Sequence, residues 1–196
     1  MEERDRIAKE LANALLTQFN TATKFRFNRL KNTVKAVSCK IRPDFPASIQ
    51  VAQKEIAHLE QSLASLQRGR NSLKERKDLT EKIAFNRNAI EVLGGLSYLL
   101  PGEAAQKSAD FEISCVEFEN VHVLNFPGEL FSTVCSGLHM AADGPVVVTS
   151  FADGVSGYLL SAEDFRQGGY EWTWALFTPE SIVSMRQTAL KILRMN

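Results

Sequence analysis

VHVLNFPGELF (residues 121–131) and PVVVTSFADG (residues 145–154) are the two stretches that decide the fold. Each begins with a short run rich in β-branched and apolar residues, typical of a strand, and then meets the Gly, Pro or Asp residues that end strands. Residues 130–140 between them have helical spacing, and residues 145–151 read as a fully buried strand. The order strand, helix, strand predicts a βαβ-like unit.

The sequence on either side of this unit adds strands and helices. Residues 111–116 and 121–126 are apolar runs joined by polar residues, which predicts an antiparallel hairpin. Residues 25–41 contain at least one strand, closed by Arg42-Pro43. Residues 162–168 and 179–195 have the spacing of a short helix and a terminal helix. We therefore predict an α/β fold, a mixed sheet with flanking helices.

Two further segments have a helical pattern. Residues 5–19 carry an apolar residue every four positions, which predicts an amphipathic helix that ends near Asn20. Residues 47–93 have similar spacing, broken around residues 68–71, and predict a long helical hairpin. This hairpin could be a coiled-coil dimerisation arm or could pack on its own domain. Only about two clean heptads are present, which favours packing on its own domain.

A change in composition divides the chain. After Gly94-Gly95 and Pro101-Gly102 the sequence becomes rich in strands. Residues 1–110 then form a helix-strand region that contains the 47–93 hairpin, and residues 111–196 form an α/β region. We expect the two regions to make one structural unit.

Composition narrows the range of partners. The 196 residues include 23 Lys and Arg against 23 Asp and Glu, so there is no overall basic field for nucleic acid, and the basic cluster at residues 68–77 reads as a solvated helix face. The charged start and the lack of a run of about 18 apolar residues predict no signal and no membrane span, hence a soluble, cytoplasmic protein by default. The three cysteines suit neither a disulfide framework nor a metal knuckle and are expected to be buried thiols.

Two polar side chains lie where open α/β sheets bind ligands. Glu129 follows a strand and a Pro-Gly step, at the expected start of a helix, where the helix dipole favours an ionised carboxylate. Complementing that dipole could also be its whole role. Tyr158 follows the Gly-containing loop after the valine strand. Its hydroxyl could bind a metal or donate a proton, or the residue could simply pack with its hydroxyl satisfied.

Four motifs in order resemble the neutral/alkaline non-lysosomal ceramidase family. They are FPGELF (126–131), VVVTSFADG (146–154), GYLLSAEDF (157–165) and GGYE (168–171), and the resemblance covers residues 111–178. It implies that Glu129 and Tyr158 are zinc ligands, joined by two histidines from an N-terminal half that also carries the nucleophilic serine. GGYE, with Tyr170 and Glu171, matches a further family feature near the site.

The sequence also departs from the family pattern. Asp153 stands where the family has Asn, and Leu160-Ser161 stands where it has Pro-Thr. The family's N-terminal half has no counterpart in this sequence. The chain's own histidines lack metal-binding spacing and are expected to be structural or surface residues; they are His58, His122 and His139.

The resemblance implies the C-terminal part of a ceramidase-like zinc-dependent amidohydrolase acting on a lipid N-acyl amine, incomplete without an N-terminal half. Two oxygen donors cannot hold zinc tightly, so zinc is expected only if another chain or segment completes the site. The catalytic nucleophile would lie in that missing half. Expected partners are this half or a second copy, together with a lipid-like substrate. The alternative is a catalytically inactive scaffold or interaction protein that uses the helical hairpin.

Overall fold

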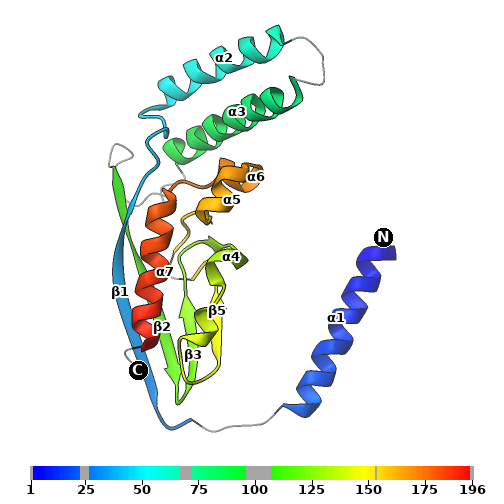
Figure 1. Cartoon of the computed structure of the whole chain (residues 1–196), viewed down its shortest axis with the longest axis vertical. Helices are drawn as coiled ribbons and strands as arrows, with labels where there is room; N and C mark the ends of the chain where they lie inside the picture. Colours follow the sequence, from blue (N-terminus) through cyan, green and yellow to red (C-terminus); the bar gives the residue numbers. More distant parts are fainter. Residues whose placement is uncertain (1, 23–26, 67–71, 96–106, 153, 195–196) are drawn as a thin grey trace.

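The fold is built on one mixed four-stranded sheet with helices on one side (Figure 1). The computed structural model describes residues 2–22, 27–66, 72–95, 107–152 and 154–194. In the order β1-β2-β3-β5, the first three strands are antiparallel neighbours and β5 joins β3 in parallel. The strands are β1 (Leu30–Lys40), β2 (Ser108–Phe118), β3 (Val121–Asn125) and β5 (Val146–Thr149). This arrangement confirms the predicted mixed α/β class and the β2–β3 hairpin.

Helix α7 (Pro179–Arg194) covers one face of the sheet. Its apolar residues recur every three or four positions, so they form one stripe along the helix. Alternate residues of the strands meet that stripe, because successive strand side chains point to opposite faces. The residues that meet there are almost fully buried, among them Ile113, Leu124, Phe126, Met185, Ala189 and Ile192. The main core lies between α7 and this inner face of the sheet.

The single helix predicted over residues 130–140 is wrong. The structure has instead a two-residue strand β4 (Glu129–Leu130), a single turn α4 (Ser132–Cys135) and a 3₁₀ turn η1 (Leu138–Met140). The backbone N–H groups of Glu129 and Phe131 are used in pairing with the β6 segment (β6 is Tyr158–Leu159). Gly137, at φ 79°, then separates α4 from η1, because this left-handed conformation cannot continue a helix. Strand pairing therefore overrides the helical spacing, and Glu129 does not lie at a helix start.

The valine strand is also less buried than predicted. β5 is at the edge of the sheet, with β3 on one side only, and the Val147 side chain is 49% exposed. Val146 and Val148 face the core, and both are half-buried. A continuous run of valines is compatible with burial on both faces, but no described helix covers the second face here.

The predicted helical hairpin consists of α2 (Ile49–Ser65) and α3 (Ser72–Gly94), which lie side by side (Figure 1). The base of α3 contacts the single-turn helix α6 (Tyr170–Thr173), where Asn88 donates hydrogen bonds to the Thr173 hydroxyl and carbonyl. The hairpin thus packs on its own domain. The break predicted around residues 68–71 lies outside the described residues.

Helix α1 (Glu2–Thr21) stands apart from the rest of the described chain (Figure 1). The sequence predicts this helix and its end near Asn20, and both predictions are confirmed. The apolar stripe, however, meets no core, because every residue from Glu3 to Ala22 is exposed. Among the described helices, none combines the length and apolar character that crossing a bilayer requires.

Candidate functional site

Glu129 and Tyr158 lie next to each other, on two short parallel strands. They are direct partners in the register between β4 and β6. The N–H of Glu129 donates to the Gly157 carbonyl at 2.9 Å, and the N–H of Phe131 donates to the Leu159 carbonyl at 3.3 Å. Two residues that are 29 positions apart in the sequence are thereby held at one end of the sheet, as their positions after two neighbouring strands predict.

The Tyr158 hydroxyl is tied electrostatically to the Glu129 carboxylate. Burial, a hydrogen bond to Glu129 and the negative charge of Glu129 together raise the pKa of Tyr158 to about 12, with smaller contributions from Tyr170 and Glu171. Each of these causes disfavours the phenolate. At neutral pH Tyr158 therefore keeps its proton, and its hydroxyl donates a hydrogen bond to the Glu129 carboxylate.

Aromatic neighbours fix the orientation of the Tyr158 ring. The ring centre lies 6.2 Å from that of Phe131 and 6.1 Å from that of Tyr170, both in edge-to-face geometry. Phe131 follows β4 directly, whereas Tyr170 begins α6 and is 66% exposed. The tyrosine side chain is thus packed on two sides, and its hydroxyl faces the carboxylate.

Gly128 is required for the two strands to approach each other. A Cβ atom at this position would lie 2.5 Å from the Ser156 hydroxyl and 2.6 Å from the Gly157 carbonyl. The loop after β5 closes over the same place, because Phe151 donates to the Gly128 carbonyl and Leu130 donates to the Ser150 hydroxyl. The FPGEL motif and the loop that follows the valine strand therefore form one unit.

Arg42 positions α6 from the far side of the site. Its guanidinium lies 4.0 Å from the ring centres of both Phe85 and Trp172 and donates to the Trp172 and Ala175 carbonyls at 3.0 and 3.1 Å. Asp44 accepts a bidentate ion pair from it, at 2.8 and 2.6 Å. Only 3% of the residue is exposed. From the sequence, Arg42 reads only as part of a strand-ending Arg-Pro step, because the partners that bury it are distant in the chain.

Ser161, one of the departures from the family pattern, caps helix α5 (Ala162–Gln167). Its hydroxyl accepts a hydrogen bond from the Asp164 N–H. The Asp164 carboxylate accepts hydrogen bonds from Ser161 and from Thr133 in α4. Burial raises the pKa of Asp164, but the hydrogen bonds from the two hydroxyls and from the Ser161 backbone together outweigh burial and lower the pKa below its ordinary value. Asp153, the other departure near the loop, lies outside the described residues.

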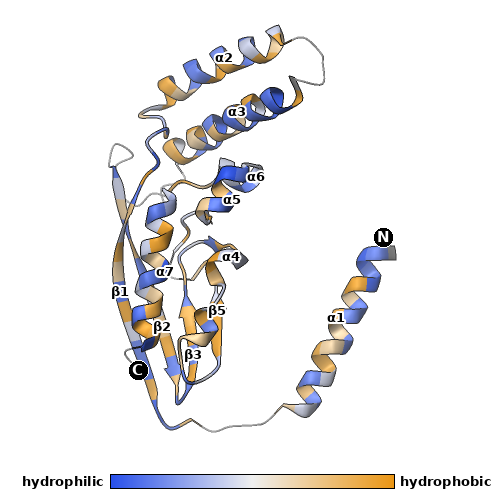
Figure 2. Ribbon diagram, in the orientation of Figure 1, coloured by the Kyte–Doolittle hydropathy of each residue, from blue (hydrophilic) through white to orange (hydrophobic). Residues whose placement is uncertain are grey.

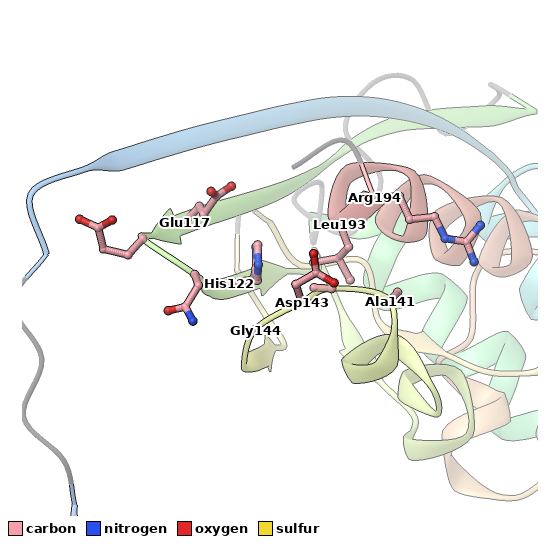
Figure 3. A pocket seen from close by; sticks show the side chains of 10 residues that line it. Glu117, His122, Ala141, Asp143, Gly144, Leu193 and Arg194 are labelled. Atoms are coloured by element: carbon pink, nitrogen blue, oxygen red, sulfur yellow. The ribbon is translucent and has the colours of Figure 1, made fainter.

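The chain's own histidines do not complete the pair. His58 and His139 are exposed, and His122 is buried in β3 at 5% exposure. His122 lines a separate cavity of about 330 Å³ together with Glu117, its cross-strand partner (Figure 3). The sequence signal for this second pair is that residues 117 and 122 flank the hairpin turn symmetrically.

Atoms of this second pair lack hydrogen-bond partners among the described residues. They are His122 Nδ1 and Glu117 Oε2, although Glu117 lies 4.0 Å from the Lys31 ammonium. A histidine buried in this way with an open cavity beside it can be satisfied by water. The cavity holds no third acidic or histidine side chain in metal-binding geometry among the described residues.

The chemistry of the Glu129–Tyr158 pair fits part of a zinc site. Carboxylate oxygen is a common zinc ligand, and zinc takes four ligands, or three with a water molecule. No group of three His, Cys, Asp or Glu side chains suited to a metal ion occurs in the described parts of the chain. The pair therefore supplies two oxygen donors, and at least one more protein ligand would have to come from elsewhere.

Among the solved structures that resemble this chain are two ceramidase structures. One is the neutral ceramidase from Pseudomonas aeruginosa, 15% identical with a TM-score of 0.46, where the match covers 85% of this chain and 28% of that chain. The other is a ceramidase complexed with C2, 16% identical with a TM-score of 0.41, where the match covers 48% of this chain and 16% of that chain. The chain thus spans less than a third of the length of either structure. No protein-family model matches the sequence, and no curated protein matches it.

Proposed function

We propose that the chain is the C-terminal part of a zinc-dependent amidohydrolase that acts on a lipid-like N-acyl amine, as in sphingolipid metabolism, with Glu129 and Tyr158 as two of the metal ligands. The observation that carries the proposal is their placement as register partners on β4 and β6, with the tyrosine hydroxyl directed at the carboxylate. The four ordered motifs that resemble the ceramidase family support the same roles for the same two residues.

The chain's own residues would bind and position the metal rather than break the amide bond. Glu129 would supply a negatively charged carboxylate oxygen, and Tyr158 would supply its phenolic oxygen. The charge of Glu129 favours the protonated form of Tyr158. When zinc is bound at such a site, it polarises a carbonyl or activates a water or hydroxyl nucleophile. Gly128 and the loop after β5 keep the two oxygens together, and the Tyr170 ring packs beside them. The nucleophile and the other ligands belong to the proposed N-terminal half.

Zinc content and ceramide hydrolysis test the proposal when the chain is co-expressed with an N-terminal half that carries the missing ligands and the nucleophile. We expect the combined sample to hold stoichiometric zinc and to hydrolyse ceramide, and the chain alone to bind zinc weakly. Glu129→Gln and Tyr158→Phe should each lower the zinc affinity of the combined sample by at least ~100-fold, more than the loss of an outer-shell partner costs. Glu163→Gln, an exposed carboxylate in α5, is the matched control.

Two results would overturn the proposal. The first is a folded, combined sample with no zinc and no hydrolysis. The second is full zinc affinity in both Glu129→Gln and Tyr158→Phe, because the metal would then be bound by other residues.

A second candidate function is an interaction protein that uses the helical hairpin. The observation that favours it is the exposure of large apolar side chains on α2 and α3, with Val51 49% and Leu73 65% exposed. Val51→Glu together with Leu73→Glu should abolish any self-association seen by light scattering if the hairpin is the contact surface. A well-behaved monomer, or an association that survives both substitutions, would exclude this use of the hairpin.

A further inference from the structure

The cavity beside His122 lies at the opposite end of the sheet from the Glu129–Tyr158 pair. His122 is near the start of β3, whereas Glu129 follows the end of that strand. The cavity, of about 330 Å³, is lined by the β2–β3 turn, the loop of residues 141–144 and the end of α7. Ligand pockets have volumes of roughly 300–1,000 Å³, and one or two water molecules need far less space. The cavity therefore has room for a small organic molecule.

The inner face of the sheet becomes polar where it meets this cavity. Hydrophobic and hydrophilic residues alternate along β1 and β2 (Figure 2), and by this alternation Glu117 shares the inner face with Ile113 of the core. His122, which is only 5% exposed, shares it with Leu124. Glu117 is the direct cross-strand partner of both Lys31 and His122. A carboxylate and an imidazole are thus neighbours at the end of the core.

Two buried polar atoms of these neighbours have no hydrogen-bond partner among the described residues. They are His122 Nδ1 and Glu117 Oε2. The Lys31 ammonium lies 4.0 Å from Glu117 Oε2, beyond hydrogen-bond distance. The terminal torsions of glutamate and histidine are broad and roughly two-fold, so both groups can turn these atoms toward the cavity. Buried polar groups are costly to leave unpaired, which favours a ligand that supplies hydrogen-bond donors.

The charges around the cavity favour a cation. Asp143 adds a second carboxylate to Glu117, and α7 ends here, where the helix dipole places partial negative charge. The Arg194 guanidinium extends away from His122 and Asp143 (Figure 3). The Glu119 carboxylate also lines the cavity, but it accepts hydrogen bonds from two backbone N–H groups before β1. The acceptors that remain are those of Glu117, His122 and Asp143.

The rest of the wall is close-packed and partly apolar. A Cβ atom on Gly144 would lie 1.7 Å from the Asn120 carbonyl oxygen, so only glycine lets this loop lie so close to the β2–β3 turn. The apolar part of the wall consists of Ala141, Ala142 and Leu193. A ligand with a short carbon chain would therefore find an apolar surface beside the three polar side chains.

We propose that this cavity binds a small primary amine in its protonated form. An ammonium group has three N–H donors, and Glu117, Asp143 and a neutral His122 each offer an acceptor. The approach of the Lys31 ammonium to Glu117 is an example of the same attraction within the chain. A metal ion fits less well, because no group of three His, Cys, Asp or Glu side chains suited to one occurs in the described parts of the chain.

Titration of the full chain with n-propylamine near neutral pH, followed by NMR of the backbone amides, tests the proposal. We expect saturable shifts at residues 117–122 and 141–144, with a dissociation constant of about 1 mM or less. Glu117→Gln removes the charge and His122→Phe removes the acceptor nitrogen, with little change of shape. Each should weaken binding by at least ~10-fold, the effect of one hydrogen bond to a charged group. Glu112→Gln, at an exposed carboxylate of the same strand, should leave binding unchanged.

Two further probes separate the amine from other occupants. 1-Propanol has nearly the same size without the charge, and tetramethylammonium has the charge without N–H donors, so neither should produce these shifts. Binding of either probe as tight as that of propylamine would overturn the proposal. The absence of saturable shifts with propylamine would also overturn it, because the cavity would then hold only water.

The variants remain decisive if one of them fails to fold. Circular dichroism reports the fold of each, and if His122→Phe unfolds, Glu117→Gln alone decides. Undiminished propylamine affinity in folded Glu117→Gln would overturn the proposal. The experiment requires neither zinc nor hydrolysis, so its outcome is independent of the proposed amidohydrolase function.

Discussion

At the scale of single residues, the Tyr158 hydroxyl reports on the candidate site. Glu129→Gln removes the carboxylate charge that disfavours the phenolate, so the pKa of Tyr158 should fall from about 12 toward its ordinary value of 10. Tyrosinate absorbance during an alkaline titration, in a Tyr98→Phe and Tyr170→Phe background, measures it directly. Because the folded-state pKa is the raised one, Tyr158 favours folding below about pH 10, and this contribution is lost as the pH rises toward 12. An unchanged titration in Glu129→Gln would show that the two groups do not interact.

Arg42 is the residue whose loss should cost most stability. Arg42→Ala leaves the Ala175 carbonyl without its side-chain donor, takes one of its donors from the Trp172 carbonyl and removes the stacked guanidinium. Unfolding in urea should therefore become easier by about 3 kcal/mol. Arg42→Lys keeps the charge but not the planar fork, and should recover only part of the loss. Asp44→Asn, at a side chain 56% exposed, should change stability by less than about 1 kcal/mol. Equal losses in Arg42→Ala and Asp44→Asn would mean that the ion pair, not the stacking, matters.

At the scale of elements, the pairing of β4 with β6 depends on Gly128. Gly128→Ala places a Cβ atom 2.5 Å from the Ser156 hydroxyl, so the strands must separate, at a cost of about 1–3 kcal/mol. The pKa of Tyr158 should then fall, because Glu129 moves away from it. A Cβ atom at position 94 would meet no atom within 4 Å, so Gly94→Ala should leave both the stability and the pKa of Tyr158 unchanged. Calorimetry measures the stability, and the tyrosinate titration measures the pKa of Tyr158. Equal values for Gly128→Ala and Gly94→Ala would contradict a special role for Gly128.

The same short strands explain how far the elements could be predicted from the sequence. Strong local patterns sufficed for α7, for the β2–β3 hairpin and for the two hairpin helices, because their apolar periods match their burial. Residues 130–140 were mispredicted because Leu130, at the start of this segment, pairs with Leu159 of β6, a contact between distant parts of the sequence that no local period reveals. The closeness of Glu129 and Tyr158 was nevertheless predictable, since both follow neighbouring strands. The burial of Arg42 was not, since its partners come from three separate elements.

At the scale of the whole molecule, the thiols report on global opening. Burial raises the pKa of Cys39 to about 12 and that of Cys115 to about 11, and both side chains are buried in the sheet. Burial also raises the pKa of Cys135, which is only half-buried, so the prediction of three buried thiols holds fully for two. With Ellman's reagent near pH 8, Cys135 should react first, and the other two should follow together at the unfolding rate. Fast labelling of Cys39 would reveal local opening of β1.

The two borders of the sheet differ in a way that bears on how a larger assembly could be built. β1 carries Lys31, Lys35 and Lys40, and such charges keep foreign strands from attaching. β5, on the opposite border, has only valines and a threonine. A strand from another polypeptide laid beside β5 would extend the sheet through main-chain hydrogen bonds alone, which demand no particular side chains. The edge of the sheet that could accept a further strand is therefore β5, which is four residues long and has no charged side chain.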